Sequence, residues 1–156
     1  MVITDNKSLN YSKKTRLKTN IRFLILHYTG MQSARVSLNR LTNPKSKVSC
    51  HYLIDRNGKV IKLVEDIKTA WHAGVSSWCG RQQCNASSIG VELEGSDDTR
   101  YEELQYNALI TLIAVLRNHY PSIQADAIVG HSDIAPGRKT DPGPSFDWSR
   151  VRHAVQ

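Results

Sequence analysis

Cysteine is scarce in this sequence, and the few that occur restrict the classes of protein it can be. The 156 residues include three cysteines, Cys50, Cys79 and Cys84, which are too few for a disulfide scaffold. Cys79 and Cys84 flank a short loop and could bridge in an oxidising compartment, but we expect free thiols because no secretory signal is evident. None belongs to a CxxC pair, which argues against a structural zinc site built from cysteines.

Long apolar runs are also missing. No segment approaches the roughly 20 apolar residues that span a bilayer, so we expect no membrane insertion. Residues 1–20 are basic but contain no apolar stretch before a small-residue cleavage site, and a secretory signal is therefore not evident. We expect a cytoplasmic protein, with a periplasmic or phage-borne location as the alternative. The chain has no internal repeat and no low-complexity segment.

The overall amino-acid composition is typical of a soluble globular domain. A hydrophobic content of 40% and a charged content of 22% over 156 residues allow one domain with a sizeable core, which we expect to be a monomer. The net charge of +7 favours acidic partners: nucleic acid, an anionic membrane surface, or the carboxylate-bearing peptides of a bacterial wall. A nucleic-acid surface would interleave basic and aromatic residues. The basic N-terminal segment shows little of that, so we expect no nucleic-acid partner.

Periodicity places strands and helices along most of the chain. Residues 1–20 are polar with little periodicity and predict an irregular, weakly tethered basic arm, followed by one domain over residues 21–156. Strand patterns occur at residues 21–26, 50–54, 60–64, 88–94 and 127–130, and helical patterns at 33–41, 102–120 and 148–155. This order predicts an α/β fold, a single domain with a central mixed β-sheet flanked by helices.

Local signals add four further expectations. Asn57-Gly58 lies between two β-rich runs and predicts a hairpin, because both residue types tolerate positive φ. Residues 71–85 are rich in glycine, serine and aromatic residues and predict a long functional loop. Asp147 should cap the last helix. In the strand at 88–94, alternation leaves Glu92 on the face opposite the apolar residues.

The segment at residues 129–144, VGHSDIAPGRKTDPGP, has too many helix and strand breakers for regular structure. His131 and Asp141 stand ten residues apart in it and could approach one metal ion from opposite ends of a loop. His27, at the end of the first apolar run, is the best third donor. Two imidazoles and a carboxylate, with a fourth position open to water, are the ligands of a catalytic zinc site. The alternative is three unrelated polar residues.

Four motifs carry a resemblance to a known family. The segment VGHSDIAPGRKTDPGP, together with HYTG at 27–30, AWHAGVS at 70–76 and SIGVELEG at 88–95, resembles the zinc-dependent N-acetylmuramoyl-L-alanine amidases. That family includes AmpD-like amidases, short phage endolysins and animal peptidoglycan-recognition proteins. The likeness covers roughly residues 21–155, with the motifs in the family's order. It implies an α/β fold and a Zn²⁺ cofactor.

The resemblance also implies an activity and its machinery. The expected reaction is hydrolysis of the amide between N-acetylmuramic or 1,6-anhydro-N-acetylmuramic acid and L-alanine of the stem peptide, in cell-wall recycling or turnover. The expected partners are peptidoglycan or its muropeptide fragments. Glu92 matches the family's general base and Lys139 its oxyanion-stabilising lysine. Glu92 could instead be a structural carboxylate, and Lys139 a substrate anchor.

Substrate contacts are expected from residues 71–85. Trp71 and His72 belong to WHAG, which the family places at the wall of the substrate groove. Arg81 could bind a peptide carboxylate through two hydrogen bonds, and Asn85 ends the same loop. The family usually has a second arginine at the position of Gln83. This sequence therefore lacks one of the two groups expected to bind a carboxylate.

Two further points complete the expected site. Asp133 could orient a metal ligand or only cap a turn. The rival to an enzyme is a peptidoglycan-binding module without catalysis. The complete set of metal ligands argues against that rival, because a pure binder does not need a site that activates water.

Overall fold

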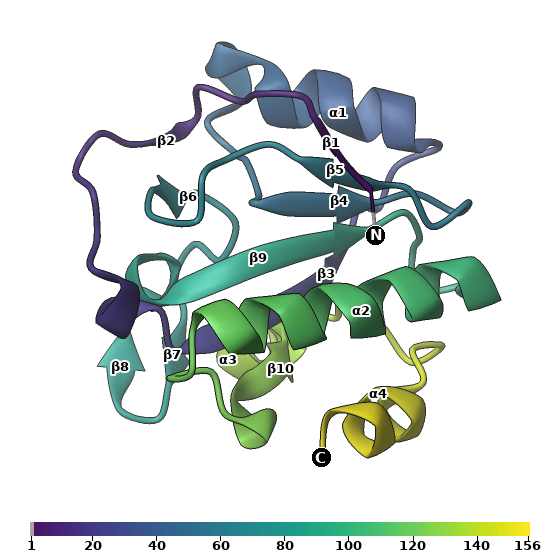
Figure 1. Ribbon diagram of the computed structural model, residues 1–156. Helices are drawn as coiled ribbons and strands as arrows, with labels where there is room; N and C mark the ends of the chain where they lie inside the picture. Colours follow the sequence, from purple (N-terminus) through teal and green to yellow (C-terminus); the bar gives the residue numbers. More distant parts are fainter. Residues whose placement is uncertain (1) are drawn as a thin grey trace.

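The structure, a computed structural model, describes residues 2–156 and contains a six-stranded mixed β-sheet flanked by helices, together with two small two-stranded sheets (Figure 1). The strands are β1 (Ile3–Asp5), β2 (Tyr11–Ser12), β3 (Phe23–Tyr28), β4 (Tyr52–Ile54), β5 (Val60–Lys62), β6 (Thr69–Ala70), β7 (Ser77–Trp78), β8 (Arg81–Gln82), β9 (Ser88–Leu93) and β10 (Ile128–Gly130). The α-helices are α1 (Ala34–Thr42), α2 (Glu103–His119), α3 (His131–Ile134) and α4 (Trp148–Val155). The predicted fold class is confirmed.

The main sheet has six strands in the order β1-β5-β4-β9-β3-β10. Strands β4, β9, β3 and β10 run parallel to one another, β5 is antiparallel to β4, and β1 is parallel to β5. The carboxyl ends of β9, β3 and β10 therefore meet at one edge of the sheet. Open α/β sheets bind their ligands at such an edge.

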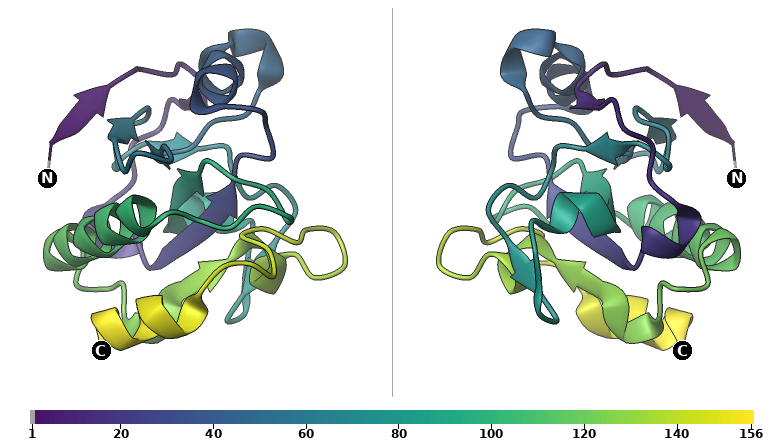
Figure 2. Two further views of the ribbon diagram at one scale, coloured as in Figure 1. Left: turned by 90° about the vertical axis from the view of Figure 1, so that its right-hand side faces the viewer. Right: turned by 90° about the vertical axis from the view of Figure 1, so that its left-hand side faces the viewer.

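The side chains of β3 and β9 point alternately to the two faces of the sheet, and these faces differ in composition. Leu26 of β3 and Val91 of β9 lie in the main apolar cluster, to which α2 contributes Leu109, Leu112, Ile113 and Leu116 and α4 contributes Val151 and Val155. These two helices lie together on one side of the sheet (Figures 1 and 2). Because successive side chains of a strand point to opposite faces, His27 and Glu92 belong to the other face.

The prediction of an irregular, weakly tethered N-terminal arm is wrong. Strand β1 extends the main sheet by pairing with β5, and β2 pairs antiparallel with β6. Arg16 is buried, and its guanidinium donates hydrogen bonds to the backbone oxygens of Asp66 at 2.8 Å and Asn85 at 3.0 Å. The sequence pattern missed this because the partner strands, and not the arm's own periodicity, supply the hydrogen bonds that order it.

The hairpin predicted around Asn57-Gly58 is confirmed, since β4 and β5 pair antiparallel. Of the two signal residues, only Gly58 has positive φ, at 76°. The turn is held by the Asp55 carboxylate, whose Oδ1 accepts hydrogen bonds from the backbone amides of Asn57 and Lys59, both at 2.9 Å. Aspartate commonly stabilises turns in this way.

The predicted long loop at residues 71–85 contains a small hairpin. Strands β7 and β8 pair antiparallel, and the two residues between them, Cys79 and Gly80, both have positive φ, at 47° and 74°. Positive φ at both turn residues suits the right-handed twist of paired strands. Cys50, Cys79 and Cys84 are all free, as expected.

The helices follow their boundary signals. The Asp147 side chain accepts a hydrogen bond from the amide of Arg150 at 2.9 Å and caps α4, as predicted. At α2, Glu102 and Gln105 form a reciprocal capping box. Within residues 2–156, none of the helices combines the length and apolar character that crossing a bilayer requires.

The strand predicted at residues 127–130 is confirmed as β10, which includes the first residues of the segment at 129–144. Contrary to prediction, His131 then begins the one-turn helix α3. Asp133 Oδ2 accepts a hydrogen bond from the amide of Gly130 at 2.7 Å and so closes the start of this turn. The contact matches the turn-capping alternative for Asp133. A single turn is too short for a periodic pattern to reveal it.

Candidate metal centre and active site

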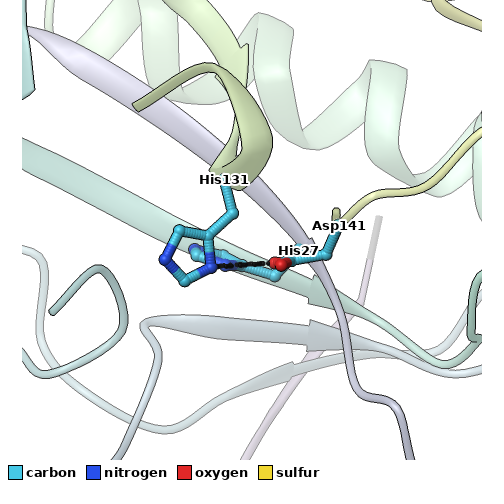
Figure 3. A group of neighbouring side chains, drawn as sticks. All are labelled: His27, His131 and Asp141. Carbon is cyan, nitrogen blue, oxygen red and sulfur yellow. Dashed lines mark hydrogen bonds and ion pairs between the residues drawn. The ribbon is translucent and has the colours of Figure 1, made fainter. Parts of the chain in front are cut away.

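Three buried side chains converge from three elements at the carboxyl edge of the sheet (Figure 3). His27 lies near the end of β3, His131 follows β10 directly, and Asp141 comes from the loop after α3. His27 Nδ1, His131 Nδ1 and Asp141 Oδ2 are each 2.9 Å from the other two atoms. The parallel pairing of β3 with β10 brings the histidines together, because it aligns Gly130 with Leu26.

The chemistry of the donors fits a cation. His131 Nε2 donates a hydrogen bond to the backbone oxygen of Ala73 at 2.9 Å, so its Nδ1 presents a lone pair to the cluster. Burial lowers the pKa of His27 to about 4, although the hydrogen bond to Asp141 opposes the shift. Neutral imidazoles and a carboxylate at this spacing suit a divalent ion held between them, and this set is typical of catalytic zinc.

Glu92 lies directly beside His27, because β3 and β9 pair in parallel with these two residues in register. Its Oε2 is buried and has no hydrogen-bond partner in the part of the chain that the structure describes. Burial raises the pKa of Glu92 well above its ordinary value, the nearby Asp141 adds to the shift, and the charge of Lys139 opposes it. An unpartnered carboxyl with a raised pKa is a candidate for proton transfer.

We expect metal-free Glu92→Gln protein to melt at a higher temperature than metal-free wild type at pH 7. In the unfolded chain Glu92 ionises near its ordinary pKa of about 4.5, whereas the native site favours the protonated form. Wild type therefore loses stability as the pH rises above that value, and glutamine, which resembles the protonated acid, does not. Thermal melts from pH 4 to 7 with a chelator should show a gap that closes at the acid end. A gap of constant size would show that ionisation of Glu92 is not its cause.

A pocket of about 420 Å³ opens over these groups. Three basic side chains line it: Arg40 of α1, Arg138 and Lys139. Among the described residues, the carboxylates in its lining are Glu92 and Asp141 alone. A cation at the metal site would add to this positive charge, so the pocket favours a substrate that carries anionic groups.

Two of these basic residues were not singled out from the sequence. Arg138 precedes Lys139 in the segment at 129–144, and its position there was an available signal. Arg40 gave no local signal, because it lies in α1, an amphipathic helix whose exposed face carries basic residues as many such faces do. Only the packing of α1 over the sheet brings Arg40 to the pocket.

The four expected substrate-binding residues do not all reach the pocket. Trp71 and His72 line it. Arg81 is exposed on β8 and lies outside the lining. Asn85 also lies outside it, and its Oδ1 accepts hydrogen bonds from the amides of His72 at 3.0 Å and Ala73 at 2.8 Å. The structure thus gives Asn85 a contact within the protein.

Comparison with known sequences identifies close relatives. A family model described as N-acetylmuramoyl-L-alanine amidase matches residues 17–144. The 1,6-anhydro-N-acetylmuramyl-L-alanine amidase AmpD of Enterobacter cloacae is 56% identical over 108 residues, which are 69% of this chain and 57% of the relative. The N-acetylmuramoyl-L-alanine amidase AmiD of Escherichia coli is 40% identical over 147 residues, 84% of this chain and 52% of AmiD. The chain thus spans somewhat more than half the length of these relatives.

Solved structures share the fold. A selenomethionine derivative of AmpD superposes with a TM-score of 0.87 at 38% identity, covering 99% of this chain and 94% of that one. AmpDh3 from Pseudomonas aeruginosa, in complex with an anhydromuramic pentapeptide, gives 0.81 at 36% identity and covers 96% and 65%. AmiD from E. coli, in complex with anhydro-N-acetylmuramic acid-L-Ala-D-γ-Glu-L-Lys, gives 0.79 at 34% identity and covers 92% and 60%.

Proposed function

Because the chain belongs to the N-acetylmuramoyl-L-alanine amidase family, we propose that it is a zinc-dependent hydrolase of peptidoglycan fragments. It cleaves the amide bond between N-acetylmuramic or 1,6-anhydro-N-acetylmuramic acid and L-alanine of the stem peptide, in cell-wall recycling or turnover. One observation carries the proposal: His27, His131 and Asp141 present their ligand atoms to one another at 2.9 Å beside the unpartnered carboxyl of Glu92.

Each group at the site has a separate role in the proposed reaction. Zinc, when bound by the two histidines and Asp141, supplies an acidified water and polarises the substrate carbonyl. Glu92 accepts the proton of the attacking water and passes it to the leaving amine. Lys139 places a cation where negative charge develops on the carbonyl oxygen. The buried Oε2 of Glu92 suits this task, because no contact within the described chain competes for its proton.

The substrate class follows from the charge of the pocket and from the relatives. The AmiD and AmpDh3 complexes contain anhydromuramic acid linked to peptides, and a γ-linked glutamate keeps a free carboxylate. Arg40 and Arg138 line the pocket near the metal ligands and can bind such carboxylates. We therefore propose muropeptides with an acidic stem as substrates.

Product analysis tests the proposal. Purified protein is incubated with an anhydro-muropeptide and, in parallel, with intact sacculi, and the products are identified by mass spectrometry. We expect free stem peptide beginning with L-alanine together with the muramic moiety. Binding of either material without cleavage would favour the non-catalytic peptidoglycan-binding module instead.

Metal removal gives a second test. We expect about one zinc per chain in the purified protein, because the three converging side chains make up one site. Exhaustive chelation should abolish hydrolysis, and added Zn²⁺ should restore it. Activity that persists with no metal detectable by elemental analysis would exclude the metal mechanism.

A further inference from the structure

A partly buried chain of hydrogen bonds continues from His27 away from the metal site. His27 Nε2 lies 3.0 Å from His72 Nδ1, and His72 Nε2 lies 3.3 Å from Ser88 Oγ. Ser88 Oγ in turn lies 2.7 Å from the backbone oxygen of Cys84. The chain ends on a carbonyl, which can only accept a hydrogen bond.

That carbonyl sets the direction of every bond in the chain. Ser88 uses its single hydrogen on the Cys84 oxygen, so its Oγ accepts from His72 Nε2. A neutral His72 then has no hydrogen on Nδ1 and accepts one from His27 Nε2. His27 is left with a lone pair on Nδ1, the atom that faces His131 and Asp141.

The opposite direction loses the hydrogen bond from Ser88 to Cys84. If His72 carried its hydrogen on Nδ1, Ser88 would have to donate to His72, and the Cys84 oxygen would lose its hydroxyl partner at 2.7 Å. His27 would then carry its hydrogen on Nδ1, where it would block coordination of a metal. In the metal-free protein, the first arrangement is opposed by the hydrogen bond that His27 Nδ1 would donate to Asp141 Oδ2 at 2.9 Å. A bound cation takes the place of that hydrogen, so the first arrangement is the one that accompanies metal binding.

The surrounding backbone is built to hold the His72 ring in place. A Cβ on Gly90 of β9 would lie 2.4 Å from His72 Cγ, so only glycine at that position lets the ring pack against the strand. Asn85 Oδ1 holds the amides of His72 and Ala73 at 3.0 and 2.8 Å.

The same short segment orients both histidine ligands. The ring of His72 receives the hydrogen bond of His27, and the backbone oxygen of Ala73 receives that of His131 at 2.9 Å. Metal-binding histidines commonly have such partners on the nitrogen that does not bind the metal.

We propose that His72 is a positioning residue of the metal site: by accepting the hydrogen of His27 Nε2, it makes Nδ1 of His27 the metal-facing nitrogen. This inference rests on the proposed metal-dependent function. It differs from the role at the wall of the substrate groove that the family resemblance implies for His72. A wall residue would act on substrate binding, whereas a positioning residue acts on zinc affinity without any substrate present.

Zinc affinity, measured by competition with a chromophoric chelator, separates the two roles. His72→Leu removes the acceptor and should weaken zinc binding roughly 10- to 100-fold, the loss typical of such partners. His72→Asn keeps an acceptor oxygen near the position of Nδ1 and should retain most of the affinity. Ser88→Ala should show a smaller loss in the same direction. His119→Leu, which removes an exposed histidine from α2, is the matched control and should bind zinc as wild type does.

Unchanged zinc affinity in His72→Leu, with a raised KM as its only defect, would overturn the proposal in favour of the wall role. Imidazole ¹⁵N NMR of the zinc-loaded wild type near pH 7 gives an independent measurement that needs no variant. Hydrogens on Nε2 of both His27 and His72 would support the proposal, and a hydrogen on Nδ1 of His72 would overturn it. If wild type bound no zinc, the proposed function would fail, whereas equal zinc affinity in wild type and His72→Leu would overturn this inference alone.

Discussion

Replacing Glu92 with glutamine is expected to remove most of the turnover while the protein keeps its zinc. Glutamine has nearly the same shape but cannot accept the proton of the attacking water, and loss of a general base typically costs roughly 10²- to 10⁴-fold in rate. The carboxylate lies beside His27 in the strand register and outside the group of three ligand atoms, so metal binding should survive. Steady-state kinetics on a soluble muropeptide, with zinc content determined on the same sample, measures both effects.

Asp141→Ala is the companion variant. Asp141 Oδ2 is one of the three converging ligand atoms, so its loss should remove zinc and activity together. The pair of variants separates a group that transfers protons from one that holds the metal. A Glu92→Gln protein with normal zinc content and nearly wild-type turnover would show that Glu92 is a structural carboxylate.

Lys139→Ala is expected to lower kcat and kcat/KM by similar factors with little change in KM. A cation that stabilises the charge developing on the carbonyl oxygen acts on the transition state more than on the bound substrate. Deleting such a donor in other enzymes costs about 2.7–4 kcal/mol, or roughly 10²- to 10³-fold in kcat. The same kinetic assay, again with zinc content measured, gives the two constants.

The result also decides between the two roles considered for Lys139. An anchor for a stem-peptide carboxylate would raise KM and spare kcat, and that outcome would withdraw the catalytic role. Lys59→Ala, which removes an exposed lysine from the turn between β4 and β5, is a suitable control because it lies outside the pocket lining. Its kinetics should equal those of wild type.

Local patterns predicted most of the elements around the site. The apolar run before His27 is β3, the alternating segment around Glu92 is β9, and the long apolar stripe is α2. These predictions are confirmed because each element is long enough to show its own period, and because the side chains that define it are buried against one core. The structure of the N-terminal arm was not predicted, because β1 and β2 are short and polar and obtain their hydrogen bonds from partners far along the chain.

For the candidate site, residue types and spacing suggested His27, His131 and Asp141, and the family resemblance implied Glu92 and Lys139. The structure brings these side chains to one pocket. The residues that line the substrate pocket were harder to predict. Arg81 seemed a suitable carboxylate ligand from its loop, yet the β7–β8 hairpin carries it away from the pocket. Arg40 had no motif to mark it, yet α1 brings it there.

The sequence by itself determined the fold class, the order of the main elements and the chemical types of the metal-site side chains, because these depend on periodicity and on residue identity. Only the tertiary structure decided which side chains share the pocket and how the histidines are oriented. Hydrogen bonds link Nε2 of His27 through His72 and Ser88 to the Cys84 carbonyl, and no spacing in the sequence reveals that order. Such a hydrogen bond depends on distance and direction in space, and residues as far apart in the chain as His27 and Ser88 acquire these only when the sheet has formed.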